Sequence, residues 1–325
     1  MIQGGKMKKI KLLALSLISI IFMIGCSAQP SSNELMEEIT ILHAGSLTVP
    51  FKEVSHAFEK KYPNYKVLHE GAGSRDTVRK VTDLGRKVEI VASADYSVIE
   101  ELMMPEYTDW YINFATNEMV LMYREGSKLS ENINKDNWYE ILLDSSVEYG
   151  HSEPDSDPCG YRSQLVWQLA EDYYGVDGLY KKLQNNRPAE NIRPKETDLL
   201  ALIDLGELDY IFIYKSVASQ HGYPYLELPD EINLRTNEYS HLYKKSSYDV
   251  NGKAPGEKIT KIGLPMVYGI TIPNNAENPE GGELWIDFLL SEKGREIMNK
   301  NGQPSIIPIE TNDKEALPKK IQDYL

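Results

Sequence analysis

The sequence contains few cysteines and a deficit of basic residues. Only Cys26 and Cys159 occur among its 325 residues, so an internal disulfide after residue 26 is excluded and the fold must rest on a hydrophobic core. Lysine and arginine number 35 against 49 acidic residues, which gives a formal net charge of -14. Because affinity for nucleic acids depends largely on clustered lysine and arginine, this balance argues against a nucleic-acid partner.

Several motifs of enzymes and metalloproteins are also missing. The six histidines show no metal-binding spacing, and the sequence has neither a G-x-S-x-G nucleophile elbow nor a Walker phosphate-binding loop. The segment Gly71-Ala72-Gly73 does not match a dinucleotide-binding fingerprint. No internal repeat of roughly 20–50 residues is present. We therefore expect a protein without a cofactor and without enzymatic activity.

The N-terminal segment predicts export. An apolar run over 12–24 follows four lysines and is shorter than the about 20 residues that a membrane span needs. It ends at Gly25 and Cys26, an arrangement similar to a lipobox. We predict a lipoprotein signal peptide over 1–26, lipidation of Cys26, a flexible polar tether over 27–37, and a lipid-anchored protein on the extracellular face of the cell membrane. The alternative is an uncleaved single-span anchor, which exports the same residues.

Strand and helix patterns alternate along the remaining chain, which predicts an α/β fold. A β-branched run over 38–43 precedes helical spacing over 47–62, in which Phe51, Val54, Ala57 and Phe58 share one face. Later strands are expected over 118–123, 210–214 and 267–272, and one helix over 282–301. The order favours two lobes joined by crossing strands, with lobe 1 formed by 38–116 plus 268–325 and lobe 2 by 117–267.

Three turns lie where a predicted strand ends and a helix begins: Gly45-Ser46, Gly73-Ser74, and 157–160. Free backbone amides and the helix dipole make such positions suitable for anions. Each turn also has a simpler interpretation. A serine before a helix is first of all an N-cap, and Pro158 after Asp157 fits a cap followed by the first helical residue.

Eight further segments are distributed over most of the chain after the tether: HAGSLTVPF at 43–51, GAGS at 71–74, VRKVTDLG at 78–85, SADYSVI at 93–99, DPCGYRSQ at 157–164, RPKETDL at 193–199, YKSVASQHG at 214–222 and VYGITIPNNAEN at 267–278. Through these segments the sequence resembles the archaeal-type tungstate/molybdate-binding proteins, a branch of the periplasmic solute-binding proteins of ABC transporters. This resemblance implies a type II periplasmic binding fold, in which each lobe has a mixed, mostly parallel sheet with flanking helices, hinged by crossing strands.

The resemblance implies a set of ligand-binding residues. Gly45 and Ser46 match the first oxyanion-binding turn of the family, and Ser74 matches its second serine. The second-lobe turn, the glutamate ligand and the tyrosine donor correspond to Asp157 with the backbone of Pro158 and Cys159, to Glu196, and to Tyr214. The chain is shorter than its relatives between Tyr180 and Arg193, which weakens the placement of Glu196.

The two acidic residues indicate the ligand if this correspondence holds. Asp157 and Glu196 would repel a dianion unless they ligate a metal centre within it, and tungsten and molybdenum can expand from four oxygens to six. Sulfur in sulfate cannot, so the site would reject sulfate. Before the family is considered, a solvated glutamate at a helix start is an equally good interpretation of Glu196.

The predicted ligand is therefore tungstate or molybdate, bound by a monomer that closes its lobes and delivers the anion to the permease and ATPase of an ABC importer. A phosphate- or sulfate-binding protein is the first alternative. An extracellular hydrolase that uses Asp157 and Glu196 as an acid/base pair is a remote one, and a structural surface lipoprotein would leave the three helix starts unexplained.

Overall fold

The computed structural model describes residues 36–325. The predicted signal peptide, Cys26 and residues 27–35 of the predicted tether lie outside this range, so their predictions stay predictions. Within the described residues the first strand already begins at Glu37. No helix of residues 36–325 has the length and apolarity needed to span a membrane.

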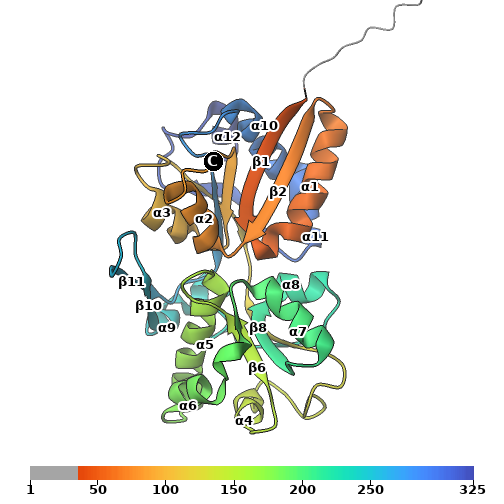
Figure 1. Ribbon diagram of the computed structural model, residues 1–325, viewed down its shortest axis with the longest axis vertical. Coiled ribbons are helices and arrows are strands. Elements are labelled where there is room, and N and C mark those ends of the chain that lie inside the picture. Colours follow the sequence, from red (N-terminus) through yellow and green to blue (C-terminus); the bar gives the residue numbers. More distant parts are fainter. Residues whose placement is uncertain (1–35) are drawn as a thin grey trace, which may run out of the picture. The chain divides into compact units, whose positions relative to one another are not determined.

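The first sheet has six strands in the order β13-β4-β12-β3-β1-β2. Strand β1 pairs in parallel with β2 and β3, whereas β12 pairs antiparallel with β3 and β4, and β13 pairs antiparallel with β4. Figure 1 shows β1 and β2 beside helix α1. The strands are β1 (Glu37–Ala44), β2 (Tyr65–Ala72), β3 (Ile90–Ser93), β4 (Ile112–Thr116), β12 (Val267–Thr271) and β13 (Ser305–Thr311).

The second sheet has five strands in the order β7-β6-β8-β5-β9. Strand β6 is parallel to β7 and β8, and β5 is antiparallel to β8 and β9. The strands are β5 (Met119–Tyr123), β6 (Tyr149–Ser152), β7 (Ile192–Arg193), β8 (Tyr210–Tyr214) and β9 (Tyr225–Glu227), and β10 (Ser247–Asn251) and β11 (Lys258–Ile262) form a separate antiparallel hairpin. These mixed sheets with flanking helices confirm the predicted fold class, although antiparallel pairings take a larger share than expected.

The helices divide between the two sheets by sequence. Elements of the first sheet contact α1 (Thr48–Lys61), α2 (Ser74–Thr82), α3 (Tyr96–Met103) and α10 (Pro279–Leu290), and α11 (Glu292–Lys300) and α12 (Lys319–Gln322) pack beside them. Residues of the second region form α4 (Trp138–Leu142), α5 (Pro158–Tyr174), α6 (Leu179–Asn186), α7 (Leu199–Leu205), α8 (Lys215–Gln220) and α9 (Ser240–Tyr243). The short 3-10 helices are η1 (Gly45–Leu47), η2 (Ala189–Asn191), η3 (Glu196–Asp198) and η4 (Asn237–Tyr239).

The apolar face predicted for the first helix is buried in α1. Phe51, Val54 and Phe58 are fully buried, and Ala57 is partly buried against the same core. Phe51 packs edge-on against Trp285 of α10, with 4.9 Å between ring centroids. Burying one such aromatic side chain stabilises the fold by about 2–3 kcal/mol. The core therefore fixes α1, and with it the turn that precedes this helix.

The prediction of one continuous helix over 282–301 is wrong. Helix α10 ends at Leu290, and Ser291 has an extended backbone with ψ of 164°. Its side chain accepts a hydrogen bond from the amide of Gly294, so it caps a new helix, α11. Serine is a preferred N-cap residue, and this helix-start signal was concealed by the apolar periodicity that continues across it.

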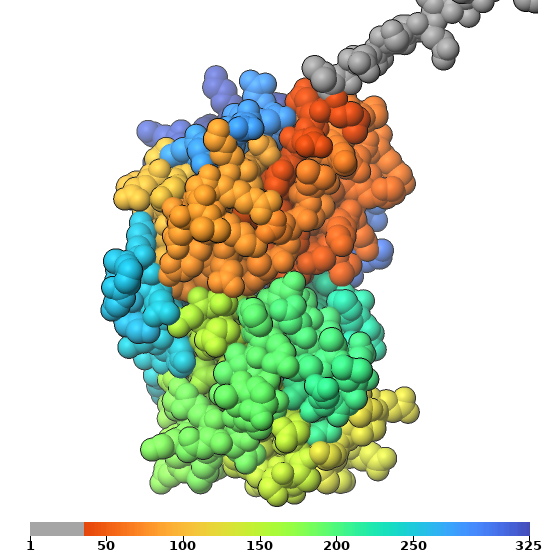
Figure 2. Space-filling model, in the orientation of Figure 1, coloured from red at the N-terminus to blue at the C-terminus, as the bar shows by residue number. Residues whose placement is uncertain are grey.

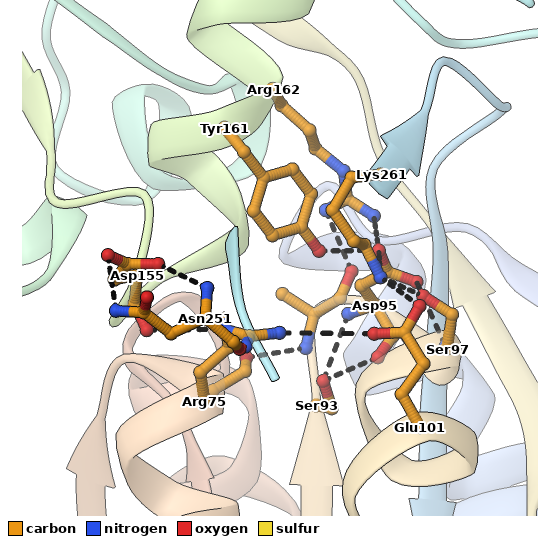
Figure 3. A network of polar contacts seen from close by, with 12 residues as sticks. Arg75, Ser93, Asp95, Ser97, Glu101, Asp155, Tyr161, Arg162, Asn251 and Lys261 are labelled. Carbon is orange, nitrogen blue, oxygen red and sulfur yellow. Dashed lines mark hydrogen bonds and ion pairs between the residues drawn. The ribbon is translucent and has the colours of Figure 1, made fainter. Parts of the chain in front are cut away.

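A buried polar network joins the elements around the first sheet to those around the second sheet and to the β10-β11 hairpin. Arg75 of α2 donates to the carbonyls of Asp155 and Asn251, which lie before α5 and in the hairpin. Lys261 of β11 donates to Glu101 at 2.8 Å and lies 3.5 Å from Asp95. Figure 3 shows these side chains together with Tyr161 and Arg162, which extend from α5 toward Asp95.

Asp95 is the central anion of this network. It lies 3.7 Å from the Arg162 guanidinium, and it accepts a hydrogen bond from the Tyr161 hydroxyl. Burial opposes ionisation, but Lys261 and Arg162 outweigh it and hold the pKa of Asp95 well below its usual range. In Figure 2 the hairpin, coloured cyan, lies against the orange segment that contains α2. The network therefore ties both regions to the segment that follows β3.

Replacing Asp95 by asparagine should destabilise the fold. The substitution Asp95→Asn keeps an oxygen that can cap α3 through Ser97, but it removes the ion partner of the buried Arg162 and leaves Lys261 paired with Glu101 alone. We expect a loss of about 3 kcal/mol in the free energy of unfolding, measured by urea denaturation. The matched control is Glu277→Gln, which breaks the exposed pair with Lys87 and should change stability by less than about 0.5 kcal/mol. Equal effects of the two substitutions would contradict this role.

A buried histidine should make stability depend on pH. His151 places Nδ1 2.6 Å from the carbonyl of Ser152 and Nε2 3.0 Å from the amide of Gln164, which fits a neutral ring. Burial lowers the pKa of His151 to about 3. The unfolded chain takes up this proton near its ordinary pKa of 6.5, so the stabilisation is complete above that pH and is lost as pH falls toward 3.

Because of His151, the free energy of unfolding should fall by about 2 kcal/mol as the pH is lowered from about 6.5 to about 5. Denaturant titrations at several pH values should therefore show a smaller pH dependence for His151→Gln than for the unmodified chain. His241→Gln, which removes an exposed histidine, is the matched control and should leave the pH dependence unchanged. An unchanged slope in His151→Gln would show that this ring is protonated in the folded protein.

Candidate functional site

The first half of the candidate site follows three neighbouring strand ends of the first sheet. Strands β1 and β2 run in register and end together at Ala44 and Ala72. The parallel strand β3 lies on the other side of β1. Because the carboxyl ends of parallel strands share one edge of a sheet, the residues that follow them are brought together. These residues include Ser46, Ser74 and Ala94.

The second half follows the parallel strands of the second sheet in the same way. Ser152 at the end of β6 pairs with Arg193 at the end of β7, and β8 lies on the other side of β6. The chain then reaches Asp157 after β6, Glu196 after β7 and Tyr214 at the end of β8. The structure therefore brings the predicted residues of this half together as well.

Two glycines allow the halves to approach each other closely. A Cβ atom on Gly45 would lie 2.9 Å from Oε1 of Glu196, and one on Gly73 would lie 2.4 Å from the carbonyl oxygen of Ser156. Gly73 has no room for a side chain, because the contact is with backbone, whereas a side chain at Gly45 would displace the carboxyl group of Glu196. Gly73 is therefore required for close contact between the two halves, and Gly45 leaves the space that Glu196 occupies.

The start of α2 differs from the anion site that the sequence predicted. The amides of Arg75 and Asp76 both donate to the carbonyl of Ser156, at 3.0 and 3.3 Å. These two amides are therefore bound to protein and are not free for an anion. At this turn the hydroxyl and the backbone amide of Ser74 are left as groups that can contact a ligand.

Asp157 is held rigidly by backbone amides. Its Oδ1 accepts from the amide of Cys159 at 3.1 Å, and its Oδ2 accepts from the amide of Glu196 at 2.9 Å. The first bond makes Asp157 the N-cap of α5, with Pro158 as the first helical residue, as the simpler interpretation of this turn expected. Asp157 is nevertheless only 1% exposed, so its charge lies inside the site.

Two other predicted contacts are restricted by this arrangement. Pro158 has no amide hydrogen, and the amide of Cys159 is already bound to Asp157. The Cys159 thiol is buried, and burial raises the pKa of Cys159 well above its ordinary value, so it stays neutral. A contact of these two residues with an anion would need other atoms than their amides.

Glu196 is the least satisfied polar side chain of the site. It is 1% exposed, and neither of its carboxyl oxygens has a hydrogen-bond partner among residues 36–325. Burial, and then the charge of Asp157, raise the pKa of Glu196 well above its ordinary value. A solvated glutamate at a helix start is therefore ruled out for this residue. Two unpaired, buried carboxyl oxygens are costly unless something binds to them.

Each of the three predicted hydroxyl groups is hydrogen-bonded to another residue near the strand ends. Ser46 Oγ lies 3.0 Å from the hydroxyl of Tyr268, Ser74 Oγ accepts from the amide of Ala94 at 2.9 Å, and Tyr214 accepts from Arg162 at 3.0 Å. Burial raises the pKa of Tyr214 well above its ordinary value, so its phenol keeps its proton. The site therefore presents two carboxyl groups and three neutral hydroxyls.

The sequence did not identify Ala94, Asn117, Arg162 and Tyr268 as parts of the site. Arg162 links the halves, because Nη1 donates both to the carbonyl of Ala94 at 2.8 Å and to Tyr214. The side chain of Asn117 donates to Tyr268 at 2.9 Å. Ala94, Arg162 and Tyr268 lie within segments that carry the family resemblance, so that signal was present. Asn117 lies outside them and could be found only from the structure.

The described residues offer no complete metal site of their own. Among residues 36–325 there is no cluster of three or more histidine, cysteine, aspartate or glutamate side chains that could hold a metal ion. Asp157 and Glu196 supply two carboxyl groups only. A metal bound here would have to bring most of its ligands with it.

Comparison with known proteins identifies relatives along nearly the whole chain. The model of the family described as bacterial extracellular solute-binding protein matches residues 39–303. An uncharacterized solute-binding protein of Petrotoga mobilis is 60% identical over 294 residues, covering 90% of this chain and 92% of the relative. The molybdate/tungstate-binding protein WtpA of Pyrococcus abyssi is 43% identical, covering 91% of this chain and 93% of the relative.

Solved structures share the fold at low sequence identity. The periplasmic molybdate-binding protein of Azotobacter vinelandii has a TM-score of 0.59 at 15% identity, covering 82% of this chain and 98% of that protein. The sulfate-binding protein SubI of Mycobacterium tuberculosis has a TM-score of 0.57 at 12% identity, covering 89% of this chain and 90% of that protein. Taken with the family match, these findings confirm the resemblance predicted from the sequence, and the chain belongs to the bacterial extracellular solute-binding proteins.

Proposed function

We propose that this protein binds tungstate or molybdate outside the cytoplasm and delivers it to an ABC importer. The observation that carries this proposal is the pair of buried carboxyl groups at Asp157 and Glu196, of which Glu196 has no partner among the described residues. The WtpA relatives from Pyrococcus abyssi and Thermococcus kodakarensis, named molybdate/tungstate-binding proteins, support the same ligand.

The ligand is favoured by the chemistry of the site. Two carboxyl groups would repel sulfate, whose sulfur atom accepts no further ligands. Tungsten or molybdenum in an oxyanion can accept one oxygen from Asp157 and one from Glu196, which converts repulsion into two bonds. The four oxo oxygens complete six-fold coordination, and Ser46, Ser74 and Tyr214 donate hydrogen bonds to them.

Capture follows from the division of the site. Ser46 and Ser74 belong to the proposed lobe 1, residues 38–116 plus 268–325, and Asp157, Glu196 and Tyr214 belong to the proposed lobe 2, residues 117–267. The anion meets one set of groups first, and the second set encloses it as the lobes close. A tether over 27–37 and lipidation at Cys26 would hold the monomer near the permease and ATPase.

Titration calorimetry with tungstate, molybdate, sulfate and phosphate tests the ligand. We expect one-to-one binding of tungstate or molybdate and no binding of sulfate. X-ray absorption spectroscopy of the bound metal should show six oxygen neighbours. A preference for sulfate or phosphate would overturn the proposal, and four oxygen neighbours would overturn the ligand role of the carboxyl groups.

Removing one carboxyl group tests its role directly. Glu196→Gln keeps the size of the side chain but replaces the carboxylate that is proposed to bind the metal by a neutral amide. We therefore expect tungstate affinity to fall about 10- to 100-fold. The matched control is Asp198→Asn, on the same 3-10 turn but 39% exposed and paired with Lys195. This control should bind tungstate as the unmodified chain does. Full affinity in Glu196→Gln would contradict metal ligation by this residue.

A further inference from the structure

The β10-β11 hairpin belongs to neither of the two sheets. It contacts the first half of the molecule, formed around the first sheet, and the second half, formed around the second sheet. Val250 of β10 is fully buried, and Ile259 of β11 packs against a cluster of apolar residues that comes largely from α2, α3, β1 and β3. The hairpin therefore shares apolar packing with the first half, although the chain enters it from α9 of the second half.

Two pairs of hydrogen bonds tie the hairpin to the second half. The side chain of Gln168 on α5 donates to the carbonyl of Ser247 at 2.8 Å and accepts from the amide of the same residue at 3.0 Å. The carboxylate of Asp155, before α5, accepts from the backbone amide and from the side chain of Asn251, both at 2.7 Å. Because paired bonds fix direction as well as distance, we expect the hairpin to stay with the second half when the two halves separate.

The polar contacts of the hairpin with the first half are made by long cationic side chains. Three of these bonds run from Arg79 Nη2 to the carbonyl of Gly252 at 2.7 Å, from Lys253 Nζ to the carbonyl of Met104 at 2.9 Å, and from Lys261 Nζ to the carboxylate of Glu101 at 2.8 Å. The side chain of Arg79 is 27% exposed, and Lys253 is exposed. Water can therefore replace the protein acceptors of Arg79 and Lys253 when the halves separate.

The two sets of bonds meet at Asn251. Its amide and side chain are bonded to Asp155, whereas its carbonyl accepts from the guanidinium of the buried Arg75, which belongs to α2. Nε of Arg75 also donates to the carbonyl of Asp155 at 3.1 Å. Figure 3 shows these three side chains side by side. A separation of the halves must break the bonds of Arg75, and none of these residues belongs to the proposed ligand set.

We propose that the β10-β11 hairpin is a clasp that holds the two halves closed and thereby sets how slowly a bound anion is released. This inference rests on the proposed function, because it requires that the anion is enclosed between the halves. Bonds that exist only in the closed form raise its population, and the apparent affinity rises with the population of the form that binds the ligand tightly. Arg79 and Lys253 therefore determine affinity without touching the anion.

The test measures the release of tungstate from the full chain in the double variant Arg79→Gln/Lys253→Met, which loses two bonds of the clasp. Radioactive tungstate is bound first and is then chased with an excess of unlabelled tungstate. Each lost bond should lower the population of the closed form about threefold, so the rate constant of release should rise about tenfold. The rate constant of association should change by less than about twofold relative to the control variant, because the clasp forms after the anion has entered.

The matched control is the double variant Arg86→Gln/Lys258→Met, which removes the same two positive charges. Arg86 pairs with Glu70 within the first half, and Lys258 donates to the side chain of Asn251 within the hairpin at 2.7 Å. Neither bond crosses between the halves, so the control should release tungstate at the rate of the unmodified chain. A fraction of unfolded protein would lower the amount of tungstate bound, but it would not change the rate constant of release.

Two results would overturn the inference alone. One is an equal rate constant of release in the clasp variant and in the control variant. The other is a loss of tungstate affinity in the clasp variant that lies entirely in the rate constant of association. If the unmodified chain binds neither tungstate nor molybdate, the proposed function itself is overturned, so a titration of the unmodified chain distinguishes the two failures.

Discussion

The arrangement of the site depends on the burial of two carboxyl groups against each other. Glu196 lies beside Gly45 and Asp157 beside Gly73, and no basic side chain is bonded to either carboxyl group among the described residues. Such burial costs several kcal/mol for an unpaired ion. The surrounding elements hold the pair in place, since backbone amides bind both oxygens of Asp157 and the core fixes α1 and α5. A centre that accepts electron pairs from oxygen would convert this cost into binding.

Much of the fold followed from local pattern. Alternating strands and helices predicted the two mixed sheets, and strand β8 over Tyr210–Tyr214 agrees with its prediction residue for residue. Long-range features were less accessible. The antiparallel addition of β12 and β13 to the first sheet depends on where the chain returns after the second sheet, and no local spacing encodes that return. The wrong prediction of one helix over 282–301 has a local cause. Ser291 is an N-cap, but the apolar periodicity continues across it and concealed the break between the two helices.

The residues of the site could be predicted as a group, but their connections could not. Helix starts and family segments pointed to Ser46, Ser74, Asp157, Glu196 and Tyr214, and the structure brings all five together. No sequence pattern indicated that the amides of Arg75 and Asp76 are bound to Ser156, or that the side chain of Asn117 contacts Tyr268, 151 positions away. Such pairings depend on which strand ends meet, and that is a property of both sheets at once.

The bonds from Arg75 and Asp76 to the carbonyl of Ser156 have a consequence for solvent exchange. These amides lie in the first turn of α2, where no intrahelical acceptor exists, so their protection from exchange comes from the other half of the molecule. Exchange at these two positions therefore requires the bonds to Ser156 to break. Two backbone hydrogens thus report the population of molecules in which this contact is open, and they need no bound ligand as a probe.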